Sequence, residues 1–278
     1  MIKPYFQNDG FTLYSADCIE AMREMGESSI DIIITSPPSG TCRNGVLDDA
    51  TCEKDKYHMR YDVFVESRTP EEYASWSVDV FREFDRVLKE NRVVLYNFGL
   101  GSDSHSGFGN SDWFSTVVAI CEGTSFNVAD MLFWKKKTAL PNNMSPNKST
   151  RICEPVLVFC RKNEMMTFLS NKKQTSEFRT GQKLYSPFYN IFEARNNDGA
   201  CDLNKATYST QLVDTLIDLY CPEDSKNEWT VLDPFSGTGT TGISAVSHGM
   251  KYVGIELSEA QCEYTVKRLG KGTNIYLF

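Results

Sequence analysis

Two segments of this 278-residue chain combine residue types that could do chemistry with elements that could position them. Residues 32–38 read Ile-Ile-Ile-Thr-Ser-Pro-Pro, an apolar strand that ends in polar residues and two prolines. Residues 231–242 read Val-Leu-Asp-Pro-Phe-Ser-Gly-Thr-Gly-Thr-Thr-Gly, a second apolar strand that enters a glycine-rich turn. Such a turn lets a nucleotide-like cofactor approach the backbone, and α/β enzymes place reactive groups at stiff strand ends at the mouth of a parallel sheet.

An acid that follows the glycine-rich turn narrows the class of cofactor. Gly237 and Gly239 permit close backbone approach, and the helix predicted after them presents its N-terminus to the ligand. Glu256 ends the next predicted strand, 17 residues after Gly239, where an acid bonds both hydroxyls of a ribose. A third glycine at the spacing of an NAD site is missing, and no Gly-Lys-Ser/Thr supports a P-loop. The pattern therefore predicts a nucleoside cofactor of another kind.

Alternating strands and helices must hold these segments together. Strands are predicted over 11–18, 30–35, 91–98, 127–134, 155–160, 230–233 and 252–256, and helices after residue 18 to about 25 and over 69–88, 112–122, 211–220, 238–248 and 258–269. This alternation predicts an α/β fold with a doubly wound, mostly parallel sheet. Residues 39–68 are predicted to form a long loop, and the polar residues 163–205 are the candidate for an inserted recognition element.

Composition restricts the classes of protein. With 41% hydrophobic residues, the chain can bury one full α/β core. No stretch approaches the roughly 18 apolar residues of a membrane span, and the N-terminus lacks a signal-peptide core, so we expect a cytoplasmic protein. The nine cysteines include no Cys-x-x-Cys pair, which indicates buried thiols in a reduced protein and predicts no metal site.

Charge is distributed unevenly along the chain. The net charge is −8, yet residues 135–183 hold eleven Lys or Arg against three Glu, which leaves that segment at +8 and the rest of the chain at −16. One basic face on an acidic body is a plausible footprint for a phosphate backbone. An ordinary solvated charge cluster is the alternative, because the same segment includes predicted strand.

The two motifs together resemble those of the DNA amino-methyltransferases, which transfer a methyl group from S-adenosylmethionine (SAM) to N4 of cytosine or N6 of adenine. Asp233–Gly239 resembles their SAM motif and Thr35–Pro38 their catalytic motif, in the order of the circularly permuted β class. The resemblance implies a Rossmann-like SAM-dependent methyltransferase fold. Residues 1–162 would form its catalytic part, 163–205 a small target-recognition insertion and 206–278 its SAM-binding part.

The resemblance also assigns roles to individual side chains of the cofactor site. Asp233 would meet the cationic amino group of the methionine moiety, Glu256 the ribose hydroxyls and Asp17 the adenine amino group. Thr207 lies in a segment that resembles the family motif beside the methionine end. The implied SAM-binding set is Asp17, Cys18, Thr207, Asp233, Phe235, Gly237, Gly239 and Glu256.

At the catalytic motif, a poor nucleophile must be activated, because the lone pair of an exocyclic base amine is delocalised into the ring. The Ser36 side-chain oxygen and the Pro37 carbonyl would accept its two protons, and the prolines Pro37 and Pro38 would fix their geometry. The methyl group would then be transferred directly, after the base has left the duplex stack.

One position departs from the family pattern. Ser39 stands where the family carries an aromatic residue that stacks on the flipped base, and we expect Tyr57 or Tyr61 of the loop to replace it. Three basic side chains are the candidate contacts to double-stranded DNA: Lys135, Lys136 and Arg151.

The target of methylation has several alternatives. Serine at position 36 is associated in this family with N4 of cytosine, which is the predicted target, and N6 of adenine is the alternative. Methylation of RNA or of a protein glutamine is disfavoured, because those relatives usually place the SAM motif first. A SAM- and DNA-binding subunit that lost catalysis through Ser39 is a further alternative. Whether this bacterial, archaeal or phage type of enzyme forms a homodimer, or accompanies a cognate restriction endonuclease, stays open.

Overall fold

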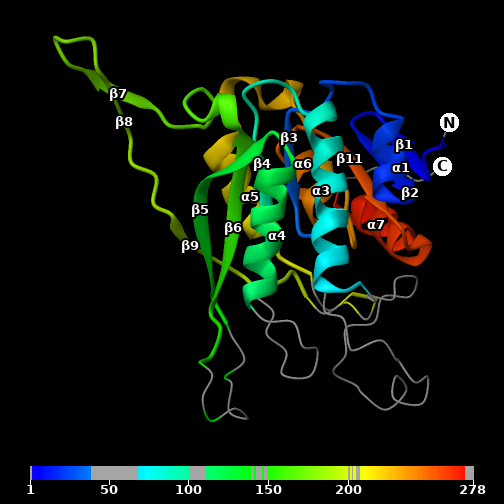
Figure 1. Ribbon diagram of the computed structural model, residues 1–278. Helices are drawn as coiled ribbons and strands as arrows, with labels where there is room; N and C mark the ends of the chain where they lie inside the picture. Colours follow the sequence, from blue (N-terminus) through cyan, green and yellow to red (C-terminus); the bar gives the residue numbers. More distant parts are fainter. Residues whose placement is uncertain are drawn as a thin grey trace.

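The computed structural model describes residues 2–38, 68–99, 110–138, 141, 146, 149–199, 201, 203–204 and 207–272 (Figure 1). In this part of the chain a nine-stranded sheet has the order β1-β2-β11-β10-β3-β4-β6-β5-β9. Its strands are β1 (Phe6–Asn8), β2 (Phe11–Ser15), β3 (Ile32–Thr35), β4 (Val94–Asn97), β5 (Phe126–Lys136), β6 (Cys153–Arg161), β9 (Ile191–Ala194), β10 (Thr230–Asp233) and β11 (Lys251–Glu256).

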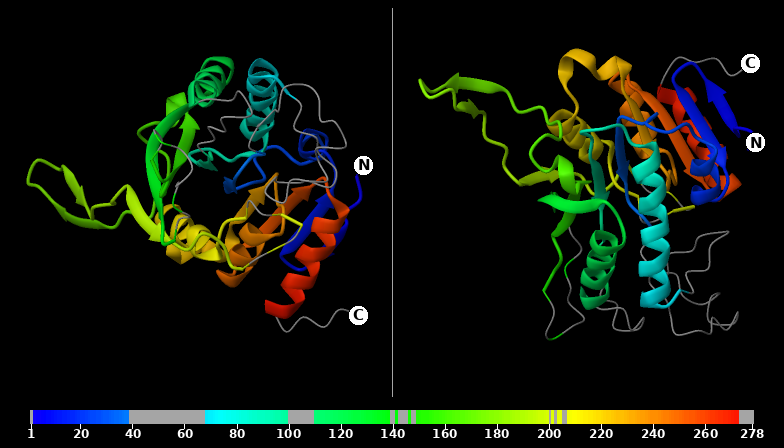
Figure 2. Two further views of the ribbon diagram at one scale, coloured as in Figure 1. Left: turned by 90° about the horizontal axis from the view of Figure 1, so that it is seen from below. Right: turned by 45° about the horizontal axis from the view of Figure 1, so that its top comes forward.

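Helices cover both faces of this sheet (Figure 2). They are α1 (Cys18–Arg23), α3 (Pro70–Val87), α4 (Asn110–Gly123), α5 (Thr210–Tyr220), α6 (Thr240–Ser247) and α7 (Glu259–Gly272), with 3-10 turns η1 (Lys162–Glu164) and η2 (Glu223–Glu228). The first three helices pack in one buried cluster and the last three in another. Ile32 and Ile34 belong to one cluster and Ile33 to the other, because successive side chains of a strand point to opposite faces. Among the described residues no helix is long and apolar enough to span a membrane.

The direction of the strands brings the two motifs together. Strands β2, β11, β10, β3 and β4 are parallel neighbours, whereas β6 runs antiparallel to both β4 and β5. Val231 of β10 pairs with Ile32 of β3, so the strands that carry the cofactor motif and the catalytic motif are adjacent. The predicted doubly wound, mostly parallel sheet and the permuted order of its motifs are confirmed.

The start of α3 is set by a capping motif that can be recognised in the sequence. The Thr69 side chain accepts a hydrogen bond from the Glu72 N–H at 3.2 Å, and the Thr69 N–H donates to Glu72 Oε2 at 2.8 Å. This reciprocal capping box, with Pro70 at the first helical position, satisfies donors that a helix end otherwise leaves unpaired. The predicted helix start is confirmed.

The described part of segment 163–205, the candidate recognition insertion, contains three strands. β7 (Gln174–Glu177) and β8 (Lys183–Tyr185) pair antiparallel in a hairpin that projects from the body (Figure 1). β9 instead pairs parallel with β5 at the edge of the main sheet. All residues of β7 and β8 are exposed, so these strands carry no alternation of apolar and polar residues from which they could be predicted. Whether the segment recognises a target stays a prediction.

The single basic face predicted for residues 135–183 is divided between the two opposite ends of the strands, which form two opposite edges of the sheet. Because β6 runs antiparallel to β4, its first residues lie where β3 and β4 end, and its last residues lie at the opposite edge. Lys135, Lys136 and Arg151 therefore lie at the first edge, whereas Arg161 lies at the other. The Arg161 guanidinium is structural, because it donates to Asp85 Oδ1 at 2.6 Å and to two backbone carbonyls of α3 and its end.

Candidate active site

A cavity of about 460 Å³ opens at the carboxyl ends of the parallel strands. All three residues of the predicted catalytic set line it: Ser36, Pro37 and Pro38. Six residues of the predicted cofactor-binding set also line it: Asp17, Cys18, Thr207, Phe235, Gly237 and Glu256. The sheet thus brings residues from both ends of the sequence to one cavity, at the strand ends where ligands bind in doubly wound folds.

The catalytic motif is held by hydrogen bonds to neighbouring strands and to α3. Ser36 Oγ donates to the Asn97 carbonyl oxygen at 3.1 Å, and Asn97 Nδ2 donates to the Pro155 carbonyl oxygen at 3.2 Å. The Tyr73 hydroxyl donates to the Pro38 carbonyl oxygen at 2.8 Å. Asn97 also lines the cavity, so the end of β4 both supports and faces the motif.

The glycine-rich turn is joined to the end of β11 by the partly buried carboxylate of Glu256. Glu256 Oε2 accepts from the Gly237 N–H at 2.8 Å, and Oε1 accepts from the Ser258 N–H at 2.9 Å. Burial raises the pKa of Glu256, and the two N–H donors oppose that rise. Gly237 has φ of +52°, which a glycine adopts without strain, and its turn brings its N–H to the carboxylate.

Asp233 lies beneath the cavity rather than on its surface, which differs from the direct contact with the cofactor that the resemblance implied. Its side chain is fully buried, and Oδ1 accepts from Thr35 Oγ1 at 2.6 Å and from the Phe235 N–H at 3.1 Å. Oδ2 accepts from the Tyr208 hydroxyl at 3.2 Å. Burial raises the pKa of Asp233, and these donors oppose the rise. Asp233 therefore ties the two motif strands to Tyr208.

Tyr208 is a cavity residue that the sequence did not single out, although its neighbour Thr207 was predicted. Its side chain lines the cavity while its hydroxyl reaches Asp233. Burial raises the pKa of Tyr208 well above its ordinary value, so the hydroxyl stays protonated and can donate. The sequence signal that could have identified Tyr208 as a site residue is its position directly after Thr207 and before a predicted helix.

Gly239 also lies off the cavity lining, and its role is to let two helices meet. It is the N-cap of α6 and has φ of +78°. A Cβ at this position would lie 2.9 Å from Thr265 Oγ1 of α7 and closer still to the Thr265 methyl group. The glycine thus serves the packing of α6 on α7, and a contact of its backbone with the cofactor stays a prediction.

The remaining predicted cofactor residues begin α1. Asp17 is the N-cap of that helix, and its Oδ1 accepts from the N–H groups of Ile19 at 2.9 Å and Glu20 at 3.1 Å. Burial raises the pKa of the neighbouring Cys18 to about 12, so its thiol stays protonated. Both residues line the cavity, and α1 holds them in fixed positions.

Two of the predicted DNA contacts are ion-paired. Lys135 Nζ lies 2.8 Å from Glu193 Oε2 of β9, and Lys136 pairs with Glu154 of β6. Lys136 lines the cavity, and Arg151 is exposed at the start of β6. The other predicted contacts to the target base, Ser39, Tyr57 and Tyr61, lie outside the described residues.

Aromatic side chains that the sequence did not assign to the site line the cavity. The Trp76 ring of α3 lies 5.5 Å from the Phe235 ring between centroids, and the Arg68 guanidinium lies 4.7 Å from the Trp76 centroid. Trp134 of β5 also lines the cavity, and its Nε1 donates to the Ala194 carbonyl oxygen at 3.1 Å. Among the described residues no group of three or more His, Cys, Asp or Glu could hold a metal ion.

Comparison with known proteins identifies relatives of this chain. A family model described as DNA methylase, of the N6/N4 methyltransferase type, matches residues 30–267. The chain is 27% identical over 266 residues to the Type II methyltransferase M.HinfI of Haemophilus influenzae, which covers 93% of this chain and 68% of that protein. It is 24% identical over 264 residues to the Type II methyltransferase M2.MboI of Moraxella bovis, which covers 92% of this chain and 86% of that protein.

Solved structures share the fold over nearly the whole chain. PvuII DNA methyltransferase (cytosine-N4-specific) matches with a TM-score of 0.68 and 17% identity, covering 98% of this chain and 94% of that one. The M1.HpyAVI–SAM complex matches with a TM-score of 0.56 and 17% identity, covering 93% of this chain and 100% of that one. At these identities the likeness establishes the architecture of the sheet and its helices.

Proposed function

Because this chain belongs to the DNA methylase family of N6/N4 methyltransferases, we propose that it methylates N4 of cytosine in double-stranded DNA, with SAM as the methyl donor. The cavity at the strand ends supports this proposal, because the catalytic motif and most of the predicted SAM-binding residues line one space. In the reaction the methyl carbon forms a bond to the amine nitrogen, the bond between the methyl carbon and the sulfur breaks, and one amine proton is released.

The Ser36 hydroxyl is the observation that carries the proposal. A hydroxyl has one proton to donate and lone pairs that accept. Ser36 Oγ donates its proton to the Asn97 carbonyl oxygen at 3.1 Å, so toward the cavity it can act only as an acceptor. An exocyclic amine offers two protons, and an acceptor is the partner that it requires.

The surroundings of Ser36 support a positioning role. Asn97 ends β4, and its side chain is bonded to the Pro155 carbonyl of β6, so the group that orients Ser36 belongs to the sheet itself. Pro37 follows Ser36 on the cavity and offers a backbone carbonyl but no N–H donor. Oxygens held in place before the reaction need no reorganisation when the amine arrives, which is how fixed dipoles accelerate a reaction.

The described residues fit SAM, which supplies an electrophilic methyl group on a sulfonium when it is bound. Glu256 faces the cavity with a carboxylate that two backbone N–H groups hold in place, as the binding of ribose hydroxyls requires. Asp17 is fixed by its capping bonds, and Phe235 offers an aromatic face beside Trp76. We propose that Asp233 acts indirectly, by holding Tyr208 and the Phe235 backbone.

The choice of cytosine rests on position 36. Serine there accompanies N4-cytosine in this family, and the PvuII enzyme, described as cytosine-N4-specific, shares the fold. The family also includes N6-adenine enzymes, so adenine is the alternative target. A homodimer and a cognate restriction endonuclease stay predictions.

Sequencing that detects modified bases tests the proposal in cells that express the wild type, Ser36→Ala or Ser29→Ala. Ser29 is a matched control, because its hydroxyl also donates to a carbonyl, that of Gly26 at 2.7 Å, but at the opposite end of β3. We expect N4-methylcytosine in one short motif in the wild type and in Ser29→Ala, and its loss in Ser36→Ala. N6-methyladenine in place of that mark would overturn the choice of base. No mark in any strain, with SAM bound by the purified protein, would favour the subunit that lost catalysis.

A further inference from the structure

The segment between β9 and α5 forms one wall of the cavity. We define residues 195–199 and 207–209 of its described part as the wall segment. Four residues of this segment line the cavity: Asn196, Asn197, Thr207 and Tyr208. The wall segment belongs to no helix or strand, so side-chain contacts must hold it in place.

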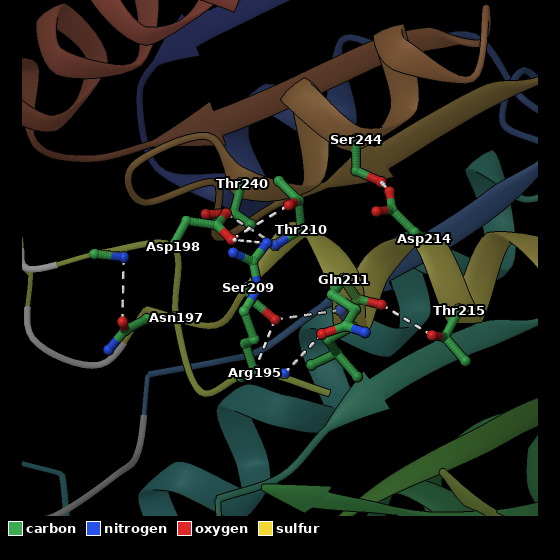
Figure 3. A network of polar contacts seen from close by, with 12 residues as sticks. Arg195, Asn197, Asp198, Ser209, Thr210, Gln211, Asp214, Thr215, Thr240 and Ser244 are labelled. Atoms are coloured by element: carbon green, nitrogen blue, oxygen red, sulfur yellow. Dashed lines mark hydrogen bonds and ion pairs between the residues drawn. The ribbon is translucent and has the colours of Figure 1, made fainter. Parts of the chain in front are cut away.

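Asp198 makes several of those contacts (Figure 3). Its Oδ2 accepts from the Thr210 N–H at 2.9 Å, and its Oδ1 lies 3.3 Å from the Thr210 hydroxyl oxygen. Arg195 Nη2 lies 3.4 Å from Oδ1, and Arg268 Nη2 lies 3.5 Å from Oδ2. The carboxylate thus connects the wall segment to the start of α5 and to α7.

Arg268 extends this connection to the glycine-rich turn. Its Nη1 donates to the Thr238 carbonyl oxygen at 2.7 Å and to the Thr238 hydroxyl at 3.2 Å. It also donates to the Thr240 hydroxyl at 3.1 Å. Thr238 and Thr240 are buried, and both line the cavity. One planar guanidinium therefore fixes the turn with one nitrogen and holds the wall segment with the other.

A small cavity lies where the wall segment meets the glycine-rich turn and α7. It has a volume of about 60 Å³, and it is lined by Asp198, by Arg268 and by residues of both walls. Thr207, Tyr208, Thr238 and Thr240 line it and the large cavity alike. The Asp198–Arg268 pair lines this small cavity, and only about one-fifth of each side chain is exposed (21% and 21%).

We propose that Asp198 and Arg268 form a clamp of positioning residues that sets the width of the SAM end of the cavity. Neither side chain has to touch SAM, because the clamp acts through Thr238, Thr240 and the wall segment. This inference rests on the proposed use of SAM. It predicts that loss of the clamp weakens SAM binding, since the free protein must then order both walls when the cofactor binds.

Calorimetric titration of SAM into the purified full chain tests the clamp. We expect Arg268→Gln to raise the Kd for SAM about tenfold, because it removes three charge-assisted hydrogen bonds to the turn. Asp198→Asn keeps the size of the side chain and removes only its charge, and we expect a rise of about threefold. Arg268→Lys keeps the charge, and we expect it to recover part of the affinity lost in Arg268→Gln.

Lys267→Gln is the matched control. Lys267 is the neighbour of Arg268 on α7, and its ion pair with Glu263 is exposed on the helix surface. We expect this variant to bind SAM as the wild type does, because exposed pairs of this kind contribute little. In steady-state assays of the clamp variants, the KM for SAM should rise while kcat changes less than about twofold, a separation that general loss of structure would not produce.

The interaction between the two residues is measured with the double variant. If Asp198 acts through Arg268, the double variant Asp198→Asn with Arg268→Gln should bind SAM no more weakly than Arg268→Gln alone. Wild-type affinity in both single variants would overturn the clamp, and if Arg268→Gln does not fold, wild-type affinity in Asp198→Asn alone would overturn it. Failure of the proposed function looks different: the wild type would bind SAM but leave DNA unmethylated, and the ratios of Kd would still decide the clamp.

Discussion

The two ends of the cavity differ in how completely the protein holds its own polar groups. At the SAM end, both oxygens of Glu256 accept from backbone N–H groups, and Asp233 accepts from three donors. At the end of the catalytic motif, Ser36 makes one hydrogen bond among the described residues, to a backbone carbonyl, and Trp134 of β5 adds an aromatic ring to the cavity lining. At the SAM end the protein's own polar groups are therefore paired with one another, and we call them the polar frame. The other end offers a hydrogen-bond acceptor and an aromatic surface.

This difference matches the two kinds of ligand that we propose. SAM is always the same molecule, so a frame that is fixed before binding lowers the cost of ordering the site. A base that leaves a DNA duplex must be received by stacking surfaces and by a few correctly oriented acceptors. Substitutions at the SAM end should therefore change cofactor affinity, and substitutions at the catalytic motif should change the rate.

Ser36→Ala tests this separation most strongly. Removal of the oxygen that accepts an amine proton should lower kcat about 100- to 1000-fold, the range found when one fixed hydrogen-bonding group is lost from an active site. The Kd for SAM should stay within about twofold of the wild type, because Ser36 is not part of the polar frame. Single-turnover methylation of DNA and calorimetric titration of SAM measure the two effects. A large loss of SAM affinity would mean that the two ends are not separate.

Gly239→Ala should have the next largest effect, on folding rather than on chemistry. The new Cβ would meet Thr265 of α7, and φ of +78° is unfavourable for alanine, so we expect a loss of about 3 kcal/mol in the free energy of unfolding. Gly249→Ala separates the two causes, because Gly249 has φ of +73° but nothing within 4 Å of an added Cβ. This control should lose only about 1 kcal/mol in urea unfolding. Equal losses would remove the packing role of Gly239.

The sequence predicts most of the fold because the strands that form the centre of the sheet are buried on both faces. Runs such as 32–34 and 231–232 are apolar throughout, and the capping box at Thr69 indicates where a helix begins. The hairpin of β7 and β8 escaped prediction because burial does not constrain its residues. The division of the basic segment escaped as well, because it depends on the antiparallel direction of β6.

The candidate site was predicted to the level of motifs but not of contacts. The motifs bring Ser36 and Glu256 to one cavity, as the order of the strands requires. Spacing along the chain does not reveal that Asp233 is covered by the donors of Tyr208 and Thr35, since those contacts join strands and segments far apart in the sequence. The place of Trp76 in the cavity could not be predicted for a similar reason, because it reaches the cavity from a helix on one face of the sheet.

Glu256→Gln sharpens the comparison through pH. Burial raises the pKa of Glu256, so the carboxylate of the free protein takes up a proton at a higher pH than an ordinary glutamate does. Ribose hydroxyls donate to the ionised form, so SAM binding favours that form and should weaken as the pH falls from about 7.5 to about 5. Glutamine should weaken binding about tenfold at neutral pH and remove most of this pH dependence.

Calorimetric titrations of both proteins across this pH range measure the effect, and the variant itself is the control for other titrating groups. The same sign applies to folding: a raised pKa in the folded protein means that protonation of Glu256 favours the folded state as the pH falls. Cofactor affinity and free energy of unfolding should therefore change in opposite directions with pH at this residue. A pH profile that is unchanged in Glu256→Gln would show that another group controls SAM binding.

The smallest expected effect compares the two basic regions that the sheet separates. Lys135 lies at the cavity edge, whereas Lys183 lies on the hairpin, which projects from the body near the end of β6 at the opposite edge (Figure 1). If DNA binds across the cavity, Lys135→Ala should lower DNA affinity about threefold at low salt and reduce the salt dependence by about one counterion. Lys183→Ala should leave both unchanged.

Glu193 supplies the internal control for this last comparison. Its carboxylate lies 2.8 Å from Lys135 Nζ and holds the pKa of that lysine above its ordinary value, so it neutralises part of the charge that DNA would meet. Glu193→Ala should therefore strengthen DNA binding by a similar factor of about three, in the direction opposite to Lys135→Ala. Equal weakening in Lys135→Ala and Lys183→Ala would show that DNA reaches the hairpin, and residues 163–205 would then contribute to recognition through β7 and β8 rather than through β9.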